Sequence, residues 1–453
     1  MFQLFNQKCK VAVFTNGKYD VFYDPKSLRL AYRSHHDEVS DQTATAFLDS
    51  SEEKAYDGSR NLMLRLLITN KCNLNCSYCQ MKKLMQKDGA ADLSYENIDL
   101  LLDKLEAEKY DYVTIHFSGG EPLIALNRIR YVCENVKKRG IENVRFAIST
   151  NGILLKDEAV RLLKEYDVQT VVSVDDLREE NSLRRNYAGH SFVGEVLRNS
   201  SEARAQGLRL GISTVFVRDT EDNVVDFVDK LHNDYAVDSL GFNYQHYSGF
   251  EKGNIDHADD YMAAYASALI KVSDRCREYN IFEEQSNRII EPFVYKTQRK
   301  CHCTSQSSQV TVLPSGMLSP CKTFASANRD ITSCASWVSD SEESNIIFSH
   351  WRGRRTDTVS PCKNCIYRAL CGGGCPYEAY VDCGSIYHAD ARYCVVVEMF
   401  FLHMLDKLEQ FGVFDTASAE LQEVTDAQRQ QLLTCTNADK LKLTASIGHF
   451  LEA

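Results

Sequence analysis

The stretch Thr69-Asn70-Lys71-Cys72-Asn73-Leu74-Asn75-Cys76-Ser77-Tyr78-Cys79-Gln80 decides the fold and the chemistry of this chain. It places Cys72, Cys76 and Cys79 in a C-x3-C-x2-C spacing. Thiolates so close together on a short loop can reach three corners of one iron–sulfur cubane, which is normally held by four cysteines. The fourth iron then has no protein ligand and is open to another molecule.

An apolar run precedes these cysteines. Residues 62–69 form a Leu-Met-Leu-Arg-Leu-Leu-Ile-Thr sequence that predicts a mostly buried strand. The cysteines therefore lie in a loop at the C-terminal end of a strand, where barrels of alternating strands and helices keep their chemistry. Buried apolar cysteines and half of a zinc site are the alternatives. The position after a strand favours the cluster.

Length, charge and cysteine content bound the class of protein. The chain has 453 residues, which predicts two to three domains around a large core. A net charge of −11 without a basic run argues against nucleic acid as a partner. We expect a cytoplasmic protein with no membrane partner, because no signal pattern and no bilayer-spanning apolar run is present. In that reducing compartment, 17 cysteines are expected to be ligands and not disulfides.

The chain divides into four predicted parts. Residues 1–60 form an appendage with a hairpin at Asn16-Gly17, which either caps the barrel or captures a peptide as an added strand. Residues 61–280 alternate six strands with six helices, which predicts an α/β fold with a mostly parallel sheet. Six units are too few for a closed eight-fold barrel, so we expect a partial (β/α)6 TIM-like barrel. Residues 281–411 are cysteine-rich, with a serine-rich insertion loop near 325–360, and residues 412–453 form a helical tail.

Two polar turns close the next strands. Ser118-Gly119-Gly120-Glu121-Pro122 follows the second strand, and its glycines permit a ligand to approach the backbone closely. Ser149-Thr150-Asn151-Gly152 follows the third strand. Its hydroxyl and amide groups suit either a polar ligand or an Asx turn.

Taken together, these motifs resemble the signature of the radical S-adenosylmethionine (SAM) enzymes. The resemblance implies that SAM chelates the open iron through its amino and carboxylate groups. The fourth strand departs from the family, since Asp176 stands where relatives have glycine, and only the arginine of a later His-Asp-x-x-Arg motif is retained, as Arg184. A guanidinium pairs well with a carboxylate, so Arg184 is the candidate for the cofactor carboxylate. The cofactor-binding residues that the resemblance implies are Tyr78, Gly119, Gly120, Glu121, Ser149, Asn151, Arg184 and Tyr244.

The cysteine-rich part resembles the SPASM domain, which is found in enzymes that mature peptides. The spacing that carries this resemblance is Cys303-x12-Gly316-x4-Cys321, then Cys362-x2-Cys365-x5-Cys371-x3-Cys375, then Cys394. The resemblance implies two auxiliary clusters, and hence three [4Fe-4S] clusters in all. One would use Cys301 and/or Cys303 with Cys321 and Cys375; the other would use Cys362, Cys365, Cys371 and Cys394. A pair of zinc sites is the alternative.

The resemblance implies a radical SAM oxidoreductase that acts on a peptide, with an electron donor such as flavodoxin or ferredoxin. The first hypothesis is an oxidative crosslink (thioether, ether or carbon–carbon) in a ribosomally made precursor peptide. The second is formylglycine formation in a sulfatase, but those relatives place an aspartate after the cysteine equivalent to Cys321, where this chain has Lys322. The third is an electron carrier or peptide-binding module without turnover. The sequence assigns no catalytic residue.

Overall fold

The computed structural model describes residues 1–8, 11–36, 60–79, 81, 91–179, 183–217, 223–246, 258–326 and 329–435. Several expectations fall outside these described residues. They concern Cys9 as a spare cysteine, most of the second half of the appendage, and the tail after residue 435.

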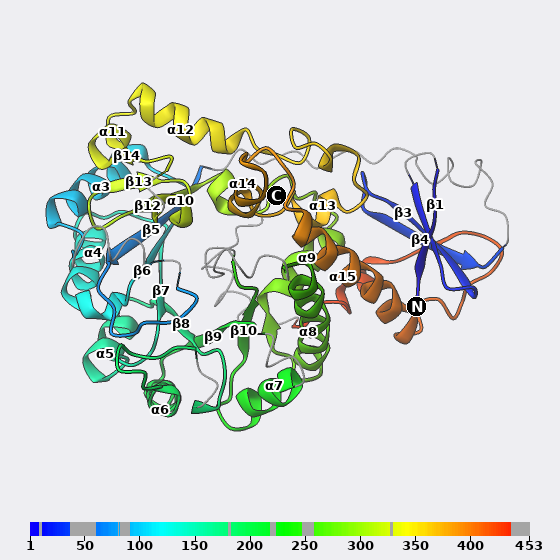
Figure 1. The fold of residues 1–453 in the computed structure, drawn as a ribbon, viewed down its shortest axis with the longest axis horizontal. Coiled ribbons are helices and arrows are strands. Elements are labelled where there is room, and N and C mark those ends of the chain that lie inside the picture. Colours follow the sequence, from blue (N-terminus) through cyan, green and yellow to red (C-terminus); the bar gives the residue numbers. More distant parts are fainter. Residues whose placement is uncertain are drawn as a thin grey trace.

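A curved sheet of ten strands forms the centre of the molecule (Figure 1). Its strand order is β11-β10-β9-β8-β7-β6-β5-β12-β13-β14. The six predicted barrel strands are parallel neighbours within it, so the α/β fold with a partial barrel is confirmed. They are β5 (Asn61–Thr69), β6 (Tyr112–Gly119), β7 (Val144–Thr150), β8 (Gln169–Ser173), β9 (Leu210–Val215) and β10 (Ser239–Asn243).

Six helices cover the outer face of this sheet (Figure 1). The first begins at Ser94, whose hydroxyl accepts a hydrogen bond from the Asn97 amide at 3.2 Å, as an N-cap residue does. Alternate strand residues such as Leu64 and Leu66 are buried in the same core as these helices. The helices are α3 (Tyr95–Glu108), α4 (Leu126–Lys138), α5 (Asp157–Glu165), α6 (Val193–Ala205), α7 (Val224–Asn233) and α8 (Ala258–Glu278).

The opposite, inner face of the sheet is polar. Strand alternation and register place on it one residue from each of six strands: Thr311, Arg65, His116, Ser149, Ser213 and Asn243. The interior of a closed (β/α)8 barrel is filled by bulky branched apolar side chains. This inner face is therefore suited to a polar ligand.

The cysteine-rich part continues the barrel sheet. Strand β12 (Gln309–Val312) pairs in parallel with β5, and β13 (Met317–Ser319) and β14 (Thr332–Ser333) follow in antiparallel. The short β11 (Phe282–Glu283) closes the other edge, and α9 (Glu284–Tyr295) follows it. The two parts therefore share one sheet.

A second sheet holds the N-terminus (Figure 1). The predicted hairpin is present as β2 (Val11–Thr15) and β3 (Tyr19–Asp24), flanked by β1 (Gln3–Lys8) and β4 (Arg29–Ser34). This sheet packs on α15 (Ala391–Gln410), where the Phe14 and Phe401 ring centroids are 5.2 Å apart. The sequence analysis did not predict strand β4, because the arginines in this strand obscure the alternation of apolar and polar residues.

Two sequence expectations differ from the structure. The serine-rich insertion is not a loop, since it holds α11 (Cys334–Val338) and α12 (Glu342–Arg352), with Ser333 and Ser341 as their N-caps. The tail is not simply helical. Its described residues include β15 (Gln422–Glu423), which pairs with β4, and the short α16 (Asp426–Gln430). Local propensity predicted neither feature. Serine favours helix N-caps as well as loops. The strand in the tail depends on its pairing with the distant β4.

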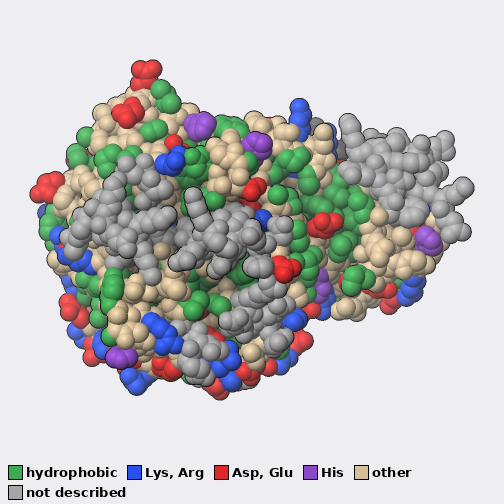
Figure 2. All heavy atoms as spheres, in the orientation of Figure 1, with side chains coloured by type: hydrophobic (Ala, Val, Ile, Leu, Met, Phe, Trp, Pro, Cys, Tyr) green, Lys and Arg blue, Asp and Glu red, His purple; other side chains and the backbone are tan. Residues whose placement is uncertain are grey.

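The surface carries both signs of charge. Acidic and basic side chains are interspersed around the lower rim of the face shown in Figure 2. Among the described residues, no helix combines the length and apolar character needed to cross a bilayer.

Candidate active site

The cysteine triad lies where the sequence predicts it, in the loop directly after β5. Cys76 is buried, and Cys72 and Cys79 are half-buried. The pKa of Cys72 is raised to about 12, mainly by burial, with contributions from the charges of Glu121 and of the other two thiols. The three sulfurs are therefore close enough to affect one another. Thiols held in such surroundings ionise when a metal centre supplies positive charge, which fits the ligands of an iron–sulfur cluster.

The Gly-Gly-Glu turn holds this loop in place. The Gly120 amide donates to the Thr69 carbonyl at 2.8 Å, and the Glu121 amide donates to the Lys71 carbonyl at 2.8 Å. A Cβ added at Gly120 would lie 2.2 Å from the Lys71 oxygen, and one at Gly119 would lie 2.1 Å from the Thr69 oxygen. The sequence analysis attributed these glycines to the close approach of a ligand to the backbone. In the structure, the space beside them is filled by the backbone of the cysteine loop.

The Glu121 side chain connects the ends of two strands. Its carboxylate accepts hydrogen bonds from the Thr150 hydroxyl at 2.6 Å and from the Asn151 amide at 2.7 Å. Burial raises the pKa of Glu121. The Asn151 side chain in turn donates to the Asn73 side chain at 2.7 Å, between two of the cysteines. Glu121 and Asn151 therefore fix the geometry of the cysteine loop.

Ser149 already has a protein partner. Its hydroxyl lies 2.9 Å from Nε2 of His116, which is fully buried. Burial lowers the pKa of His116 well below its usual value, and the charges of Arg65 and Lys322 lower it further, so the ring is neutral. The sequence analysis missed Arg65 and His116 as site residues. Their signal is a charged or polar residue inside an apolar strand.

Tyr78, Arg184 and Asp175 form one hydrogen-bonded group. The Tyr78 hydroxyl donates to the Asp175 carboxylate, and the Arg184 guanidinium donates to the Tyr78 oxygen at 2.6 Å. Arg184 and Asp175 also form an ion pair at 3.9 Å. The structure thus brings together Tyr78 and Arg184, as predicted for neighbours of one cofactor. It adds Asp175, which the sequence analysis did not assign to the site.

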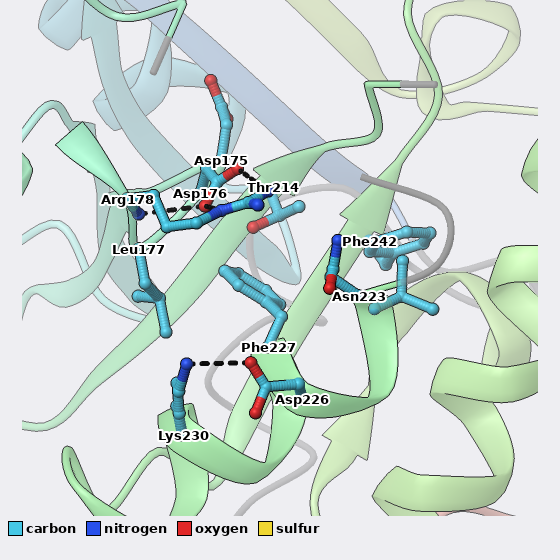
Figure 3. Close-up of a pocket in the computed structure, with 11 residues that line it drawn as sticks. Asp175, Asp176, Leu177, Arg178, Thr214, Asn223, Asp226, Phe227, Lys230 and Phe242 are labelled. Carbon is cyan, nitrogen blue, oxygen red and sulfur yellow. Dashed lines mark hydrogen bonds and ion pairs between the residues drawn. The ribbon is translucent and has the colours of Figure 1, made fainter. Parts of the chain in front are cut away.

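A small cavity adjoins this group (Figure 3). It has a volume of about 60 Å³, room for about two water molecules. Asp175 and Asp176 line it beside Thr214, Phe227 and Phe242. Arg178 reaches across it and forms an ion pair with Asp176 at 2.8 Å. Asp175 therefore belongs both to the lining of this cavity and to the Tyr78 group.

Tyr244 lies in other surroundings than those predicted. Its ring packs against Tyr265 and Tyr393, with centroids 5.5 and 5.9 Å away. Burial raises its pKa well above the usual value, and the charge of Cys375 adds to this effect. The structure therefore associates Tyr244 with the C-terminal cysteines.

The C-terminal cysteines form two groups. Burial and the charge of Glu378 raise the pKa of Cys375, and the charges of Cys303 and Cys321 raise it further. The pKa of Cys371 is raised to about 12, mainly by burial, and three thiols contribute to this shift: Cys394, Cys362 and Cys365. The structure thus brings Cys303, Cys321 and Cys375 near one another, and likewise Cys362, Cys365, Cys371 and Cys394.

Cys301 lies next to the second of these groups. It acts on Arg299 through its charge, and its carbonyl lies against Gly372, the neighbour of Cys371. Within the described ranges, no three side chains of the metal-binding types converge on one point as the ligands of a single ion do. Cys133 on α4 and Cys276 on α8 are core residues, and Cys383 is exposed.

Known proteins are similar in sequence to the part of the chain that holds this site. Residues 66–231 match the model of the radical SAM superfamily. The uncharacterized protein MJ0907 of Methanocaldococcus jannaschii is 29% identical over 187 residues, 41% of this chain and 63% of that protein, so the match spans a little under two thirds of its length. The radical SAM cyclopropyl synthase TigE of Paramaledivibacter caminithermalis is 23% identical over 384 residues, 79% of this chain and 77% of TigE.

Solved structures share the fold. Native anSMEcpe with bound AdoMet and Cp18Cys peptide matches with a TM-score of 0.64 and 20% identity, over 78% of this chain and 98% of that chain. Streptococcus suis SuiB bound to precursor peptide SuiA matches with a TM-score of 0.53 and 14% identity, over 86% of this chain and 99% of that chain. Residues 66–231, which include the cysteine triad and most of the partial barrel, therefore resemble the radical SAM superfamily, and the chain shares its fold with these solved structures.

Proposed function

We propose that this protein is a radical SAM maturase that installs an oxidative crosslink (thioether, ether or carbon–carbon) in a ribosomally made precursor peptide. One observation carries the proposal: a radical SAM domain shares its sheet with a part that holds two further groups of cysteines. The similarity to TigE, a cyclopropyl synthase, and to structures that contain peptides supports a peptide substrate.

The cofactors of this proposal are SAM and three [4Fe-4S] clusters. When bound, the triad cluster and SAM would supply a one-electron cleavage that yields a hydrogen-abstracting radical. Each cluster would be held by its own set of cysteines. The first set is Cys72, Cys76 and Cys79, the second is Cys303, Cys321 and Cys375, and the third is Cys362, Cys365, Cys371 and Cys394. We assign Cys303 to the second set because its charge acts on both of the other members.

The residues around the triad would hold and shield the reacting groups. Tyr78, Asp175 and Arg184 form a rigid polar wall next to Cys76, whose pKa the Arg184 charge lowers against the effect of burial. Glu121 and Asn151 hold the cysteine loop at a fixed distance from the strand ends. Such pre-organisation keeps a reactive group in register with a substrate carbon and excludes water.

The N-terminal sheet is our candidate for the capture of the peptide leader. Its terminal strand in the sheet order is β1, and an extended peptide can add to such an edge through main-chain hydrogen bonds. Crosslinking mass spectrometry of the copurified peptide would place the leader beside β1. Crosslinks confined to the barrel would remove this assignment.

The function is tested with protein reconstituted under argon. We expect about twelve irons per chain, and release of methionine and 5′-deoxyadenosine with SAM and dithionite. Co-expression with the short peptide encoded beside the gene should give a peptide that has lost two hydrogen atoms per crosslink. Conversion of a cysteine to formylglycine would instead remove its sulfur. An electron carrier without turnover would release neither methionine nor 5′-deoxyadenosine.

A matched pair of variants tests the ligand assignment. Cys303→Ser should lower the iron content by roughly a third, because one of three clusters loses a ligand. Cys383→Ser should retain all of the iron, since this exposed thiol belongs to none of the three sets. Equal iron in the two variants would refute the assignment of Cys303.

A further inference from the structure

Arg354, which follows α12, is a fully buried arginine with an unusual set of partners. Every hydrogen bond that its guanidinium donates within the described part of the chain goes to a backbone carbonyl oxygen. The acceptors are Gly373 at 2.9 Å, Gly374 at 3.1 Å, His388 at 2.8 Å, and Ile386. A buried cation that faces only uncharged oxygens is strongly unfavourable, so the charge of Arg354 calls for a counter-charge from another source.

Two of these carbonyls belong to the segment that joins the two groups of C-terminal cysteines. Residues 372–374 are three successive glycines. They connect Cys371, at the end of α13 (Arg368–Cys371), to Cys375, the N-cap of α14 (Pro376–Cys383). The φ angles of the three glycines are 68°, 87° and 69°, a conformation that other residues adopt only with strain. Arg354 therefore holds the turn between a cysteine of the third set and a cysteine of the second.

The position of Gly373 shows how close the guanidinium lies to the third set. A Cβ added at Gly373 would lie 3.7 Å from Nη1 of Arg354 and 3.9 Å from Sγ of Cys362. The Gly373 amide also donates a hydrogen bond of 3.2 Å to Sγ of Cys371. Arg354 and two thiols of the third set thus surround one glycine.

A second chain of hydrogen bonds connects Arg354 with the second set. The buried side chain of Gln306 donates to the Arg354 carbonyl at 2.7 Å, and its side-chain oxygen accepts from the Cys303 amide at 3.3 Å. Burial lowers the pKa of Arg354, and the charges of Cys375, Cys303 and Cys362 oppose this effect. The thiols that act on Arg354 thus come from both sets, as the hydrogen bonds do.

The counter-charge for Arg354 is best supplied by these thiols as cluster ligands. The Asp390 carboxylate also acts on Arg354, but it forms its ion pair with Arg392, at 3.9 Å. A cubane held by cysteine thiolates carries net negative charge, and its reduction potential depends on the surrounding charge and on hydrogen bonds to its sulfurs. A fixed positive charge nearby favours the state that holds one more electron.

We propose that Arg354 is a positioning residue for the two C-terminal clusters, which fixes the turn between them and makes both of them easier to reduce. The proposal rests on the proposed function and deepens it, because it names the residue that sets the potential of the clusters. The effect on potential comes from the charge of the guanidinium, and the fixed turn comes from its hydrogen bonds. The two contributions can therefore be separated by substitution.

The test uses the full chain with Cys72→Ala, Cys76→Ala and Cys79→Ala, so that only the second and third sets can bind clusters. After reconstitution under argon, this parent chain should hold about eight irons. Stepwise reduction in the presence of redox mediators, followed by electron paramagnetic resonance, gives the midpoint potential of each cluster. No turnover and no peptide are required.

Two substitutions of Arg354 in this chain separate charge from hydrogen bonding. Arg354→Gln keeps two N–H donors for the glycine carbonyls but removes the charge. We expect it to weaken the reduction of both clusters about tenfold, a fall of about 59 mV for a one-electron couple. Arg354→Lys keeps the charge and should restore most of the potential. Arg352→Gln is the matched control, because Arg352 is exposed and its Nε donates to the Ser307 carbonyl at 3.0 Å, so the midpoints should not move.

Each result decides for or against the proposal. Equal midpoints in Arg354→Gln and Arg354→Lys, whether shifted or not, overturn it. Loss of iron from both variants also overturns it, because Arg354 would then serve packing alone. Loss of iron from Arg354→Gln but not from Arg354→Lys supports it, because assembly of the clusters would then require the charge.

The iron content separates this proposal from the proposed function. A parent chain without this iron would remove the C-terminal clusters from the proposed function, and the role of Arg354 with them. About eight irons with midpoints that no Arg354 variant moves would overturn only the role of Arg354.

Discussion

The Arg184 guanidinium donates a hydrogen bond of 2.6 Å to the phenolic oxygen of Tyr78, and that phenol donates to the Asp175 carboxylate. The three residues come from the cysteine loop, the end of β8 and the segment that follows it. Burial raises the pKa of Asp175, and the Arg184 charge opposes this effect. Arg184 thus supplies a positive charge that favours the ionised form of this buried carboxylate beside Cys76.

Removal of the Arg184 charge should destabilise the fold. Arg184→Met leaves Asp175 buried without its cation, which typically costs about 3–5 kcal/mol. Urea unfolding of the iron-loaded protein, followed by circular dichroism, would measure the loss. Arg130→Met is the control, because its 3.7 Å pair with Glu158 is exposed and worth at most about 1 kcal/mol. Equal losses in the two variants would contradict this role of Arg184.

The hydrogen bond between Thr150 and Glu121 should contribute measurably to stability. Thr150→Val removes the 2.6 Å bond to a buried carboxylate and should lower the free energy of unfolding by about 1.5–3 kcal/mol. Thr114→Val is a close control, since the Thr114 hydroxyl is buried and has no hydrogen-bond partner among the described residues. That variant should be neutral or slightly stabilising, so a larger loss there would count against this prediction.

Gly120 should be essential for iron binding. In Gly120→Ala the new methyl group would lie 2.2 Å from the Lys71 oxygen, so the cysteine loop must move. We expect the iron of the triad cluster to be lost, with the C-terminal clusters retained. Gly140→Ala is the control, because its new methyl group meets no atom within 4 Å. Its only strain is the positive φ of 65° at this position, which costs about 1 kcal/mol or more of stability. We expect this variant to retain its iron. Full iron in Gly120→Ala would refute the prediction.

The sequence predicted the parts of this protein that depend on local pattern. Strand β5, the cysteine spacing and the hairpin at Asn16-Gly17 are each encoded within a few neighbouring residues, and all three lie where expected. The helix α12 was mistaken for a loop, because the serines at its start suit either structure until the burial of Phe348 and Trp351 decides between them.

The features that the sequence analysis missed depend on contacts between distant segments. Arg65 and His116 belong to the site only because β5 and β6 pair in one register. Tyr244 follows a barrel strand but lies with Cys375, more than a hundred residues later. Nothing in the residues next to each position specifies these partners.

The pairing of β12 with β5 has a mechanical consequence. Cys79 follows β5 in the chain and Cys321 follows β13, and β12 pairs with both of these strands, so the two cysteines are attached to one hydrogen-bonded sheet. In the proposed function, the separation between the first and second clusters would then be set by sheet geometry and not by a linker. Truncation before residue 309 would leave β5 as an unpaired edge of the barrel sheet, and such edges favour aggregation.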